Sequence, residues 1–121
     1  MESKTPPNKY QIAGVDERDR GFNRHAEIHE LAGQYQAIFR YETFLLKAEP
    51  QDTEQAAMMM LVEQLHERGY TQLRTRLLFR GEEYLGNQEI WAEHPDPPTM
   101  GILKKIFHIL RSKIRRVDEA T

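Results

Sequence analysis

The chain has 121 residues, of which 39% are hydrophobic and 30% charged, and these values predict a single polar but folded domain. It contains no cysteine, which excludes disulfides, thiolate metal sites and thiol nucleophiles. The sequence contains neither a secretory signal nor an apolar run near the roughly 20 residues of a membrane-spanning helix. We therefore expect a cytoplasmic protein that is not integral to a membrane.

Charge is distributed unevenly along the chain, whose net charge is −2. Residues 1–98 contain 11 Lys and Arg against 17 Asp and Glu, which gives −6. Residues 99–121 contain 6 Lys and Arg against 2 Asp and Glu, which gives +4. A basic C-terminal segment on an acidic body predicts either an anionic partner or docking of that segment on its own body.

Composition divides the chain into four parts, of which the first is a flexible leader over residues 1–8. An α+β body is expected over residues 9–94. It is followed by a Pro-rich linker over residues 95–98 and by a basic amphipathic helix over residues 99–121.

The first half of the body is predicted to be rich in strands. A short strand is expected over residues 10–15 and a charged, exposed loop over residues 16–23, while residues 25–31 fit either a strand or a helix. Residues 35–46 are rich in aromatic and branched side chains, which favours a strand over the competing helix. Alternation would place five of these side chains on one face: Tyr35, Ala37, Phe39, Tyr41 and Leu45.

The most strongly patterned element is a helix over residues 53–68. Asp52 is its expected N-cap with Gln55 as capping-box partner, and Gly69 suits the left-handed residue that ends a helix. The core face of this helix follows the spacing i, i+3, i+4 and i+7. Its residues are Met58, Leu61, Val62 and Leu65.

A second strand-rich region follows the helix. Residues 70–79 read as a strand with Leu73, Thr75, Leu77 and Phe79 on one face. We expect a bulge at Gly81, a hairpin turn at Gly86 and Asn87, and a partner strand over residues 88–93. The order of elements predicts a small two-layer α+β domain, with an antiparallel or mixed sheet and one packed helix, plus the C-terminal amphipathic helix after the Pro-rich linker.

The C-terminal helix, over residues 100–117, separates apolar and basic side chains onto two halves. It is expected to cover its own sheet or the same helix of a second subunit, or alternatively to contact an acidic partner or an anionic membrane surface. The apolar contact residues are Leu103, Ile106, Phe107, Leu110 and Ile114. The basic contact residues are Lys104, Lys105, Arg111, Arg115 and Arg116.

Three residues are spaced like metal ligands, because His25, Glu27 and His29 would share one face of a strand. No further ligand is evident near them in the sequence, so we interpret them as a solvated polar face and expect neither a metal site nor a cofactor. The sheet aromatics are expected to belong to the core rather than to a ligand site. They are Tyr10, Tyr35, Tyr41 and Trp91.

Arginines form a second candidate site, because Arg74, Arg76 and Arg80 would lie on one face of a predicted strand. A row of guanidinium groups can bind phosphate or carboxylate, so these residues are candidates for anion binding. The alternative is that they pair across the hairpin with its acidic residues, which are Glu82, Glu89 and Glu93.

No nucleophile, base and orienting group can be recognised together in the sequence. The leading hypothesis is therefore a non-enzymatic binding or regulatory module that acts through protein–protein contacts or self-association. A peripheral membrane protein anchored by the C-terminal helix is one alternative, and a small enzyme with an unrecognised site is another. Nucleic acid is not an expected partner, because the body is acidic and such binding needs a basic surface.

Overall fold

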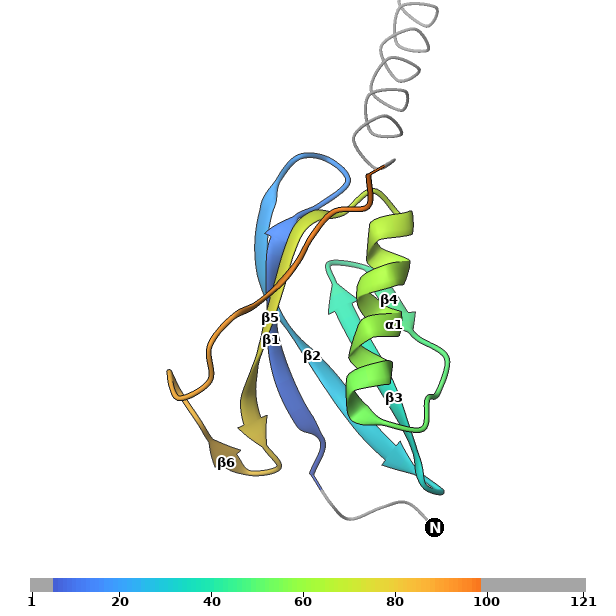
Figure 1. Cartoon of the computed structure of the whole chain (residues 1–121), viewed down its shortest axis with the longest axis vertical. Coiled ribbons are helices and arrows are strands. Elements are labelled where there is room, and N and C mark those ends of the chain that lie inside the picture. The colour runs from blue at the N-terminus through green and yellow to red at the C-terminus, as the bar shows by residue number, and fades with distance from the viewer. Residues whose placement is uncertain (1–5, 99–121) are drawn as a thin grey trace, which may run out of the picture.

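The computed structural model describes residues 6–98, which form one antiparallel sheet of seven strands and one α-helix (Figure 1). The helix, α1, spans Glu54–Glu67. The strands are β1 Asn8–Val15, β2 Gly21–Leu31, β3 Gln34–Tyr41, β4 Phe44–Lys47, β5 Thr71–Arg80, β6 Glu83–Tyr84 and β7 Ala92–His94. Their order in the sheet is β4-β3-β2-β1-β5-β6, and β7 also pairs with β5. The predicted antiparallel sheet with one helix is confirmed, whereas the predicted helix over residues 99–121 lies outside the described residues.

Strands β1 to β4 form a meander of successive antiparallel hairpins. Residues 25–31, which fitted a strand or a helix, belong to β2, and the strand favoured over residues 35–46 is present but divided by a tight turn after Tyr41. Phe44 pairs with Tyr41 across this turn, so Leu45 faces away from the core and is 43% exposed. The prediction that Leu45 shares the core face was therefore wrong, because the turn resets the alternation.

The two faces of the sheet differ because side chains alternate along each strand. We call the face that packs against α1 the inner face and the opposite one the outer face. In Figure 1, α1 lies over β3, which it contacts most, and it also contacts β2. The buried inner side chains include Ile12, Phe22, Ala26, Ile28, Ala37, Phe39, Tyr41 and Leu73 from the strands. Those of α1 include all four predicted core residues: Met58, Leu61, Val62 and Leu65. Each large side chain buried here stabilises the fold by roughly 1.5–3 kcal/mol.

Both ends of α1 are capped by local hydrogen bonds. The N-cap is Thr53, whose Oγ1 accepts a 3.0 Å hydrogen bond from the amide of Ala56, so the prediction of Asp52 was wrong by one residue. At the C-terminus Gly69 has φ +95°, as predicted, and Tyr70 donates its amide to the carbonyl of Leu65 at 3.0 Å. This cap directs the buried Tyr70 into the core and the chain into β5.

The chain after β5 turns earlier than the sequence suggested. The register pairs Arg80 with Glu83, so a first tight turn contains Gly81. A second turn at Gly86 and Asn87 is closed by a 3.1 Å hydrogen bond from the Gln88 amide to the Leu85 carbonyl. Strand β6 pairs only with the end of β5, and the chain returns as β7 beside Leu73, Arg74 and Thr75. The predicted turn at Gly86 and Asn87 is therefore present, and the predicted partner strand is shorter, at Ala92–His94. The bulge predicted at Gly81 was wrong, because Gly81 lies in the turn between β5 and β6.

A β-bulge in β5 changes which side chains share a face. Tyr10 of β1 pairs with Leu77, but the preceding Lys9 pairs with Phe79, so Leu78 is the additional residue. Phe79 therefore lies on the outer face, where the Lys9 ammonium is 5.7 Å from its ring centroid. The prediction that Phe79 shares a face with Leu77 was wrong, because one additional residue inverts the alternation.

Leu65 provides a test of how α1 packs. Leu65→Ala should lower the free energy of unfolding by about 2–5 kcal/mol, because this fully buried side chain would leave a cavity. Met59 lies on the solvent side of the same helix and is 55% exposed, so Met59→Ala should change the free energy of unfolding by less than about 0.5 kcal/mol. Urea unfolding followed by circular dichroism measures both values. Equal losses in the two variants would contradict this assignment of the helix faces.

Candidate functional site

The predicted ligand-like residues of β2 do share one face. His25 pairs with Gln11 and Glu27 with Lys9, which places both on the outer face. The Nε2 atom of His29 lies 2.9 Å from Glu27 Oε1, so these two form a partly exposed pair with each other. Within residues 6–98 no group of three His, Asp or Glu side chains could hold a metal ion.

The three predicted arginines are separated by the bulge in β5. Arg74 pairs with Ala13 and Arg76 with Gln11, so both are on the outer face. Arg80 follows the bulge and lines a different depression, of about 300 Å³, beside the start of α1, and the prediction that all three share a face was wrong. In that region the hydroxyl of Tyr10 donates a hydrogen bond to Glu54, and burial together with this bond raises the pKa of Tyr10.

Trp91 lies next to the two outer arginines. Its ring centroid is 4.7 Å from the guanidinium carbon of Arg74 and 4.6 Å from that of Arg76. The ring is only partly buried, so its predicted place in the core was wrong. Sequence reasoning missed this contact because it depends on where β7 pairs with β5. We call Arg74, Arg76 and Trp91 the arginine–tryptophan cluster.

A ladder of neutral amides orients the guanidinium of Arg76. Its Nε donates to Gln11 Oε1 at 2.8 Å and its Nη1 donates to Asn87 Oδ1 at 3.3 Å. The amide of Gln11 in turn donates to Asn23 Oδ1 at 3.0 Å, which extends the ladder to β2. These partners hold Arg76 in place without neutralising its charge.

A groove of about 840 Å³ lies beside the cluster, between the β1–β2 hairpin and the segment that contains β7. Arg24 and Arg74 contribute cationic side chains, and Glu93 and Asp96 contribute carboxylates. Arg74 and Glu93 are cross-strand partners, yet no ion pair joins them among the pairs within residues 6–98. Gly14 also lines the groove, and a Cβ atom there would lie 2.8 Å from the carbonyl oxygen of Thr71, so β1 and β5 approach closely only because this residue is glycine.

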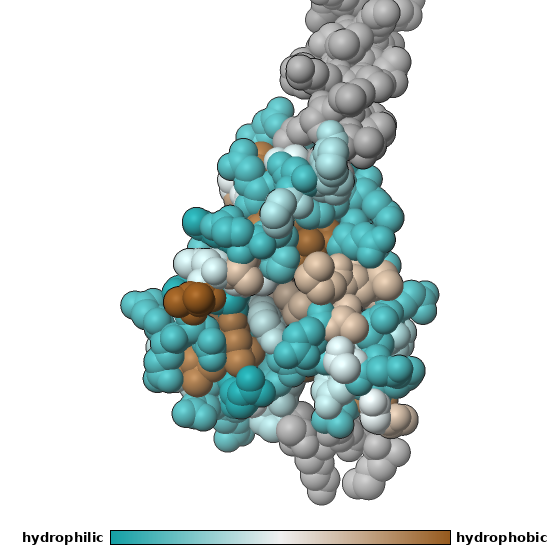
Figure 2. All heavy atoms as spheres, viewed as in Figure 1, coloured by the Kyte–Doolittle hydropathy of each residue, from teal (hydrophilic) through white to brown (hydrophobic). Residues whose placement is uncertain are grey.

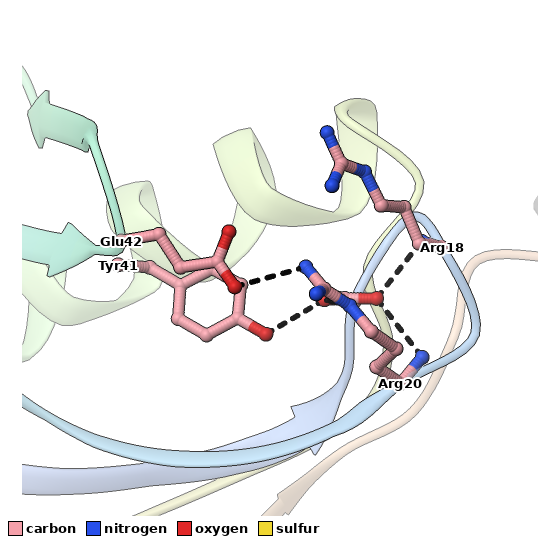
Figure 3. A network of polar contacts seen from close by, with 5 residues as sticks. Arg18, Arg20, Tyr41 and Glu42 are labelled. Atoms are coloured by element: carbon pink, nitrogen blue, oxygen red, sulfur yellow. Dashed lines mark hydrogen bonds and ion pairs between the residues drawn. The ribbon is translucent and has the colours of Figure 1, made fainter.

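One wall of the groove is held by Asp16, whose carboxylate accepts several hydrogen bonds. Figure 3 shows this polar network, with Arg18, Arg20, Tyr41 and Glu42 labelled. The Tyr41 hydroxyl donates to it at 2.7 Å and the backbone amides of Arg18 and Arg20 donate at 2.8 and 2.9 Å. The Arg20 guanidinium contacts both Asp16, at 3.1 Å, and Glu42, at 3.2 Å. Asp16 is 1% exposed and β2 begins at Gly21, so the prediction of an exposed loop over residues 16–23 was wrong at its first residue and at its last three.

These contacts also set the ionisation of the network. Burial alone would raise the pKa of Asp16, but the backbone hydrogen bonds from Arg20 and Arg18 and the one from Tyr41 outweigh it, and the pKa lies below its ordinary value. The hydrogen bond to Asp16, with burial, raises the pKa of Tyr41. At neutral pH Asp16 is therefore an ionised acceptor that fixes the loop, and its role is structural.

The opposite wall is held to β5 by two side chains. His94 Nε2 lies 2.8 Å from Thr75 Oγ1, and Asp96 Oδ1 accepts a 2.9 Å hydrogen bond from the amide of Gln72. The same Asp96 oxygen is 3.5 Å from Nε2 of the buried His66. Burial, and then the neighbouring His66, lower the pKa of His94. The predicted linker over residues 95–98 is thus fastened to the body at Asp96.

The predicted contact residues of the C-terminal helix, from Leu103 to Arg116, lie outside the described residues. In the part of the chain that the structure describes, no helix is long and apolar enough to cross a membrane. Comparison with known proteins found no matching family model, no matching curated protein and no matching solved structure.

The Asp16 network makes a pH-dependent prediction. Asp16→Asn should lower the free energy of unfolding at neutral pH by roughly 1–3 kcal/mol, because a buried charged acceptor of several hydrogen bonds is lost. The folded pKa of Asp16 is below its ordinary value of about 3.9, so this stabilisation is complete at neutral pH and is lost as the pH falls below that value.

Urea unfolding of the native chain and of Asp16→Asn across this acidic range measures the effect. The difference between the two proteins should shrink as the pH falls. Glu63→Gln, at an exposed position of α1, is the control and should show no such trend. A difference that is constant with pH would mean that Asp16 does not stabilise the fold through its charge.

Proposed function

We propose that this protein is a non-enzymatic binding module that contacts a protein partner through the outer face of its sheet. The observation that carries this proposal is the arginine–tryptophan cluster at the edge of an open groove. Tryptophan and arginine are the residue types most enriched among those that dominate the energy of protein interfaces. The amide ladder adds support, because it holds Arg76 in one orientation before any partner arrives.

The titratable groups around the groove favour binding over catalysis. His94 is engaged by Thr75, and Asp96 is engaged by the amide of Gln72 and by His66. Thr75, whose hydroxyl His94 contacts, is only 4% exposed, so this pair is not open to a substrate as a nucleophile and its base would have to be. The groove is also open and partly polar, unlike the enclosed apolar pockets that typically hold small molecules.

The C-terminal helix predicted over residues 99–121 is proposed as a second contact element. Its basic half suits an acidic partner or the acidic body of a second copy, which would account for self-association or regulation. An anionic membrane surface is the alternative partner for it, since cations close to such a surface each contribute about 1 kcal/mol. The absence of cysteine suits the reducing cytoplasm, where we propose that the protein acts.

A peptide selection tests the proposed binding surface. Random linear peptides displayed on phage are selected on the full-length protein, and Trp91, the single tryptophan of the chain, reports binding through its fluorescence. Arg74→Ala should weaken the selected peptides by about 1–2 kcal/mol, or roughly tenfold. Arg80→Ala is the matched control, since it lies in the same strand beyond the bulge, and should leave affinity unchanged.

Failure to select any peptide would contradict the proposed function. Selected peptides that bind equally well to native protein and to Arg74→Ala would contradict the surface assigned to it. Arg76→Ala and Trp91→Phe provide second variants at the cluster. Circular dichroism first establishes that each variant is folded.

The second contact element has its own test. Replacing Lys104, Lys105, Arg111, Arg115 and Arg116 by glutamine should leave the thermal unfolding midpoint of the body unchanged. It should weaken any salt-sensitive association, measured by light scattering for self-association and by flotation with phosphatidylserine vesicles for the membrane alternative. An unchanged salt response in both assays would mean that the basic half is only solvated.

A further inference from the structure

The outer face is basic although the body is acidic. Residues 6–98 contain ten Lys and Arg and sixteen Asp and Glu. The strand registers place five of these ten cations on the outer face, namely Lys9, Arg40, Lys47, Arg74 and Arg76. They place only two of the sixteen carboxylates there, namely Glu27 and Glu93. Charge is therefore segregated between the outer face and the remaining surface.

The cations of this face are not neutralised within the described chain. No ion pair within residues 6–98 involves any of the five, and Glu27 is engaged by His29. Arg76 has only neutral amide partners, and Arg74 contacts the ring of Trp91. Two guanidinium groups beside one ring are thus available to carboxylates from outside, which they can bind in a bidentate manner.

We infer that the partner contacts this face through an acidic segment of polypeptide, an inference that rests on the proposed function. Complementary charge would draw such a segment to the outer face and away from the acidic remainder of the body. Single-stranded nucleic acid is less well matched, because its bases would have to stack on the aromatic ring that lies among the cations of the cluster. The one tryptophan of the chain is already in contact with both guanidinium groups.

Exposed apolar and aromatic side chains near the cluster indicate what else the partner segment carries. Ile90, one residue before Trp91, is 87% exposed, and Tyr84 is 64% exposed. Figure 2 shows brown, hydrophobic atoms exposed at the left of this view, within a surface that is mostly hydrophilic. The acidic segment is therefore expected to carry apolar side chains between its carboxylates, so that both kinds of contact form together.

Fluorescence of Trp91 in the full-length protein tests the inference directly. The probe is a synthetic peptide of glutamates interrupted by single leucines, and its matched control has glutamine in place of every glutamate. The acidic peptide should bind at least about tenfold more tightly than the control, and raising the salt concentration should weaken it.

Three variants locate the binding. Arg74→Gln and Arg76→Gln should each weaken the acidic peptide by about tenfold, because each removes one guanidinium. Arg80→Gln removes the same group from the same strand beyond the bulge and should have no effect. Equal weakening by all three would mean that only net charge matters, and it would overturn the inference.

Other outcomes separate this inference from the proposed function. Equal affinity for the acidic peptide and the glutamine peptide would overturn the inference of an acidic partner but would not contradict the proposed function as a binding module. Binding of oligothymidine or phosphatidylserine vesicles, but not of the peptide, with the same dependence on Arg74 would overturn it in favour of another anionic partner. Concentration-dependent self-association abolished by Arg74→Gln would overturn the inference, because it would assign the face to the acidic surface of a second copy. Absence of binding by any selected peptide would instead contradict the proposed function itself.

Discussion

One helix can cover only one face of a sheet, and this constraint determines what each strand of the body carries. With α1 packed on the inner face, alternate residues of every strand must tolerate water. The outer face meets this requirement with long cationic and amide side chains rather than with small polar ones. Their apolar stems can cover the sheet while their polar ends stay solvated, which is consistent with the near-complete burial of Ala13 on this face. The face that suits a partner is therefore also the one that the fold leaves open.

The groove is bounded by two loops that are both fixed by a carboxylate. Asp16 accepts the amides of Arg18 and Arg20 at the β1–β2 turn, and Asp96 accepts the amide of Gln72. Gln72 has φ +55°, a left-handed conformation that costs energy for a residue other than glycine, and the hydrogen bond to Asp96 helps to hold it. Charged acceptors form the stronger class of hydrogen bond, so both walls are ordered before a partner binds.

Periodicity in the sequence was sufficient to predict which side chains face the core in an element that has one uninterrupted pattern. The core face of α1, from Met58 to Leu65, and its end at Gly69 follow from spacing and backbone preference alone. The faces of Leu45, Phe79 and Arg80 could not be predicted, because a turn or a bulge lies before each of them. Alternation has a period of two, so one additional residue inverts every later assignment, and only pairing with a neighbouring strand reveals it.

The candidate site shows the same division between local and non-local information. The sequence was enough to place Arg74 and Arg76 together as candidates for anion binding, because their spacing puts them on one side of a strand without an intervening bulge. Trp91 could not, because its contact with them depends on the pairing of β7 with β5, and nothing near it in the sequence fixes that register.

The position of Trp91 beside two arginines has an energetic consequence. The ring attracts two guanidinium groups that repel each other, and no carboxylate within residues 6–98 forms an ion pair with either of them. A carboxylate that bound between them would relieve this repulsion as well as form its own hydrogen bonds. An acidic partner of the kind inferred above would therefore bind these guanidinium groups more tightly than a neutral one, which is the difference in affinity that selective recognition requires.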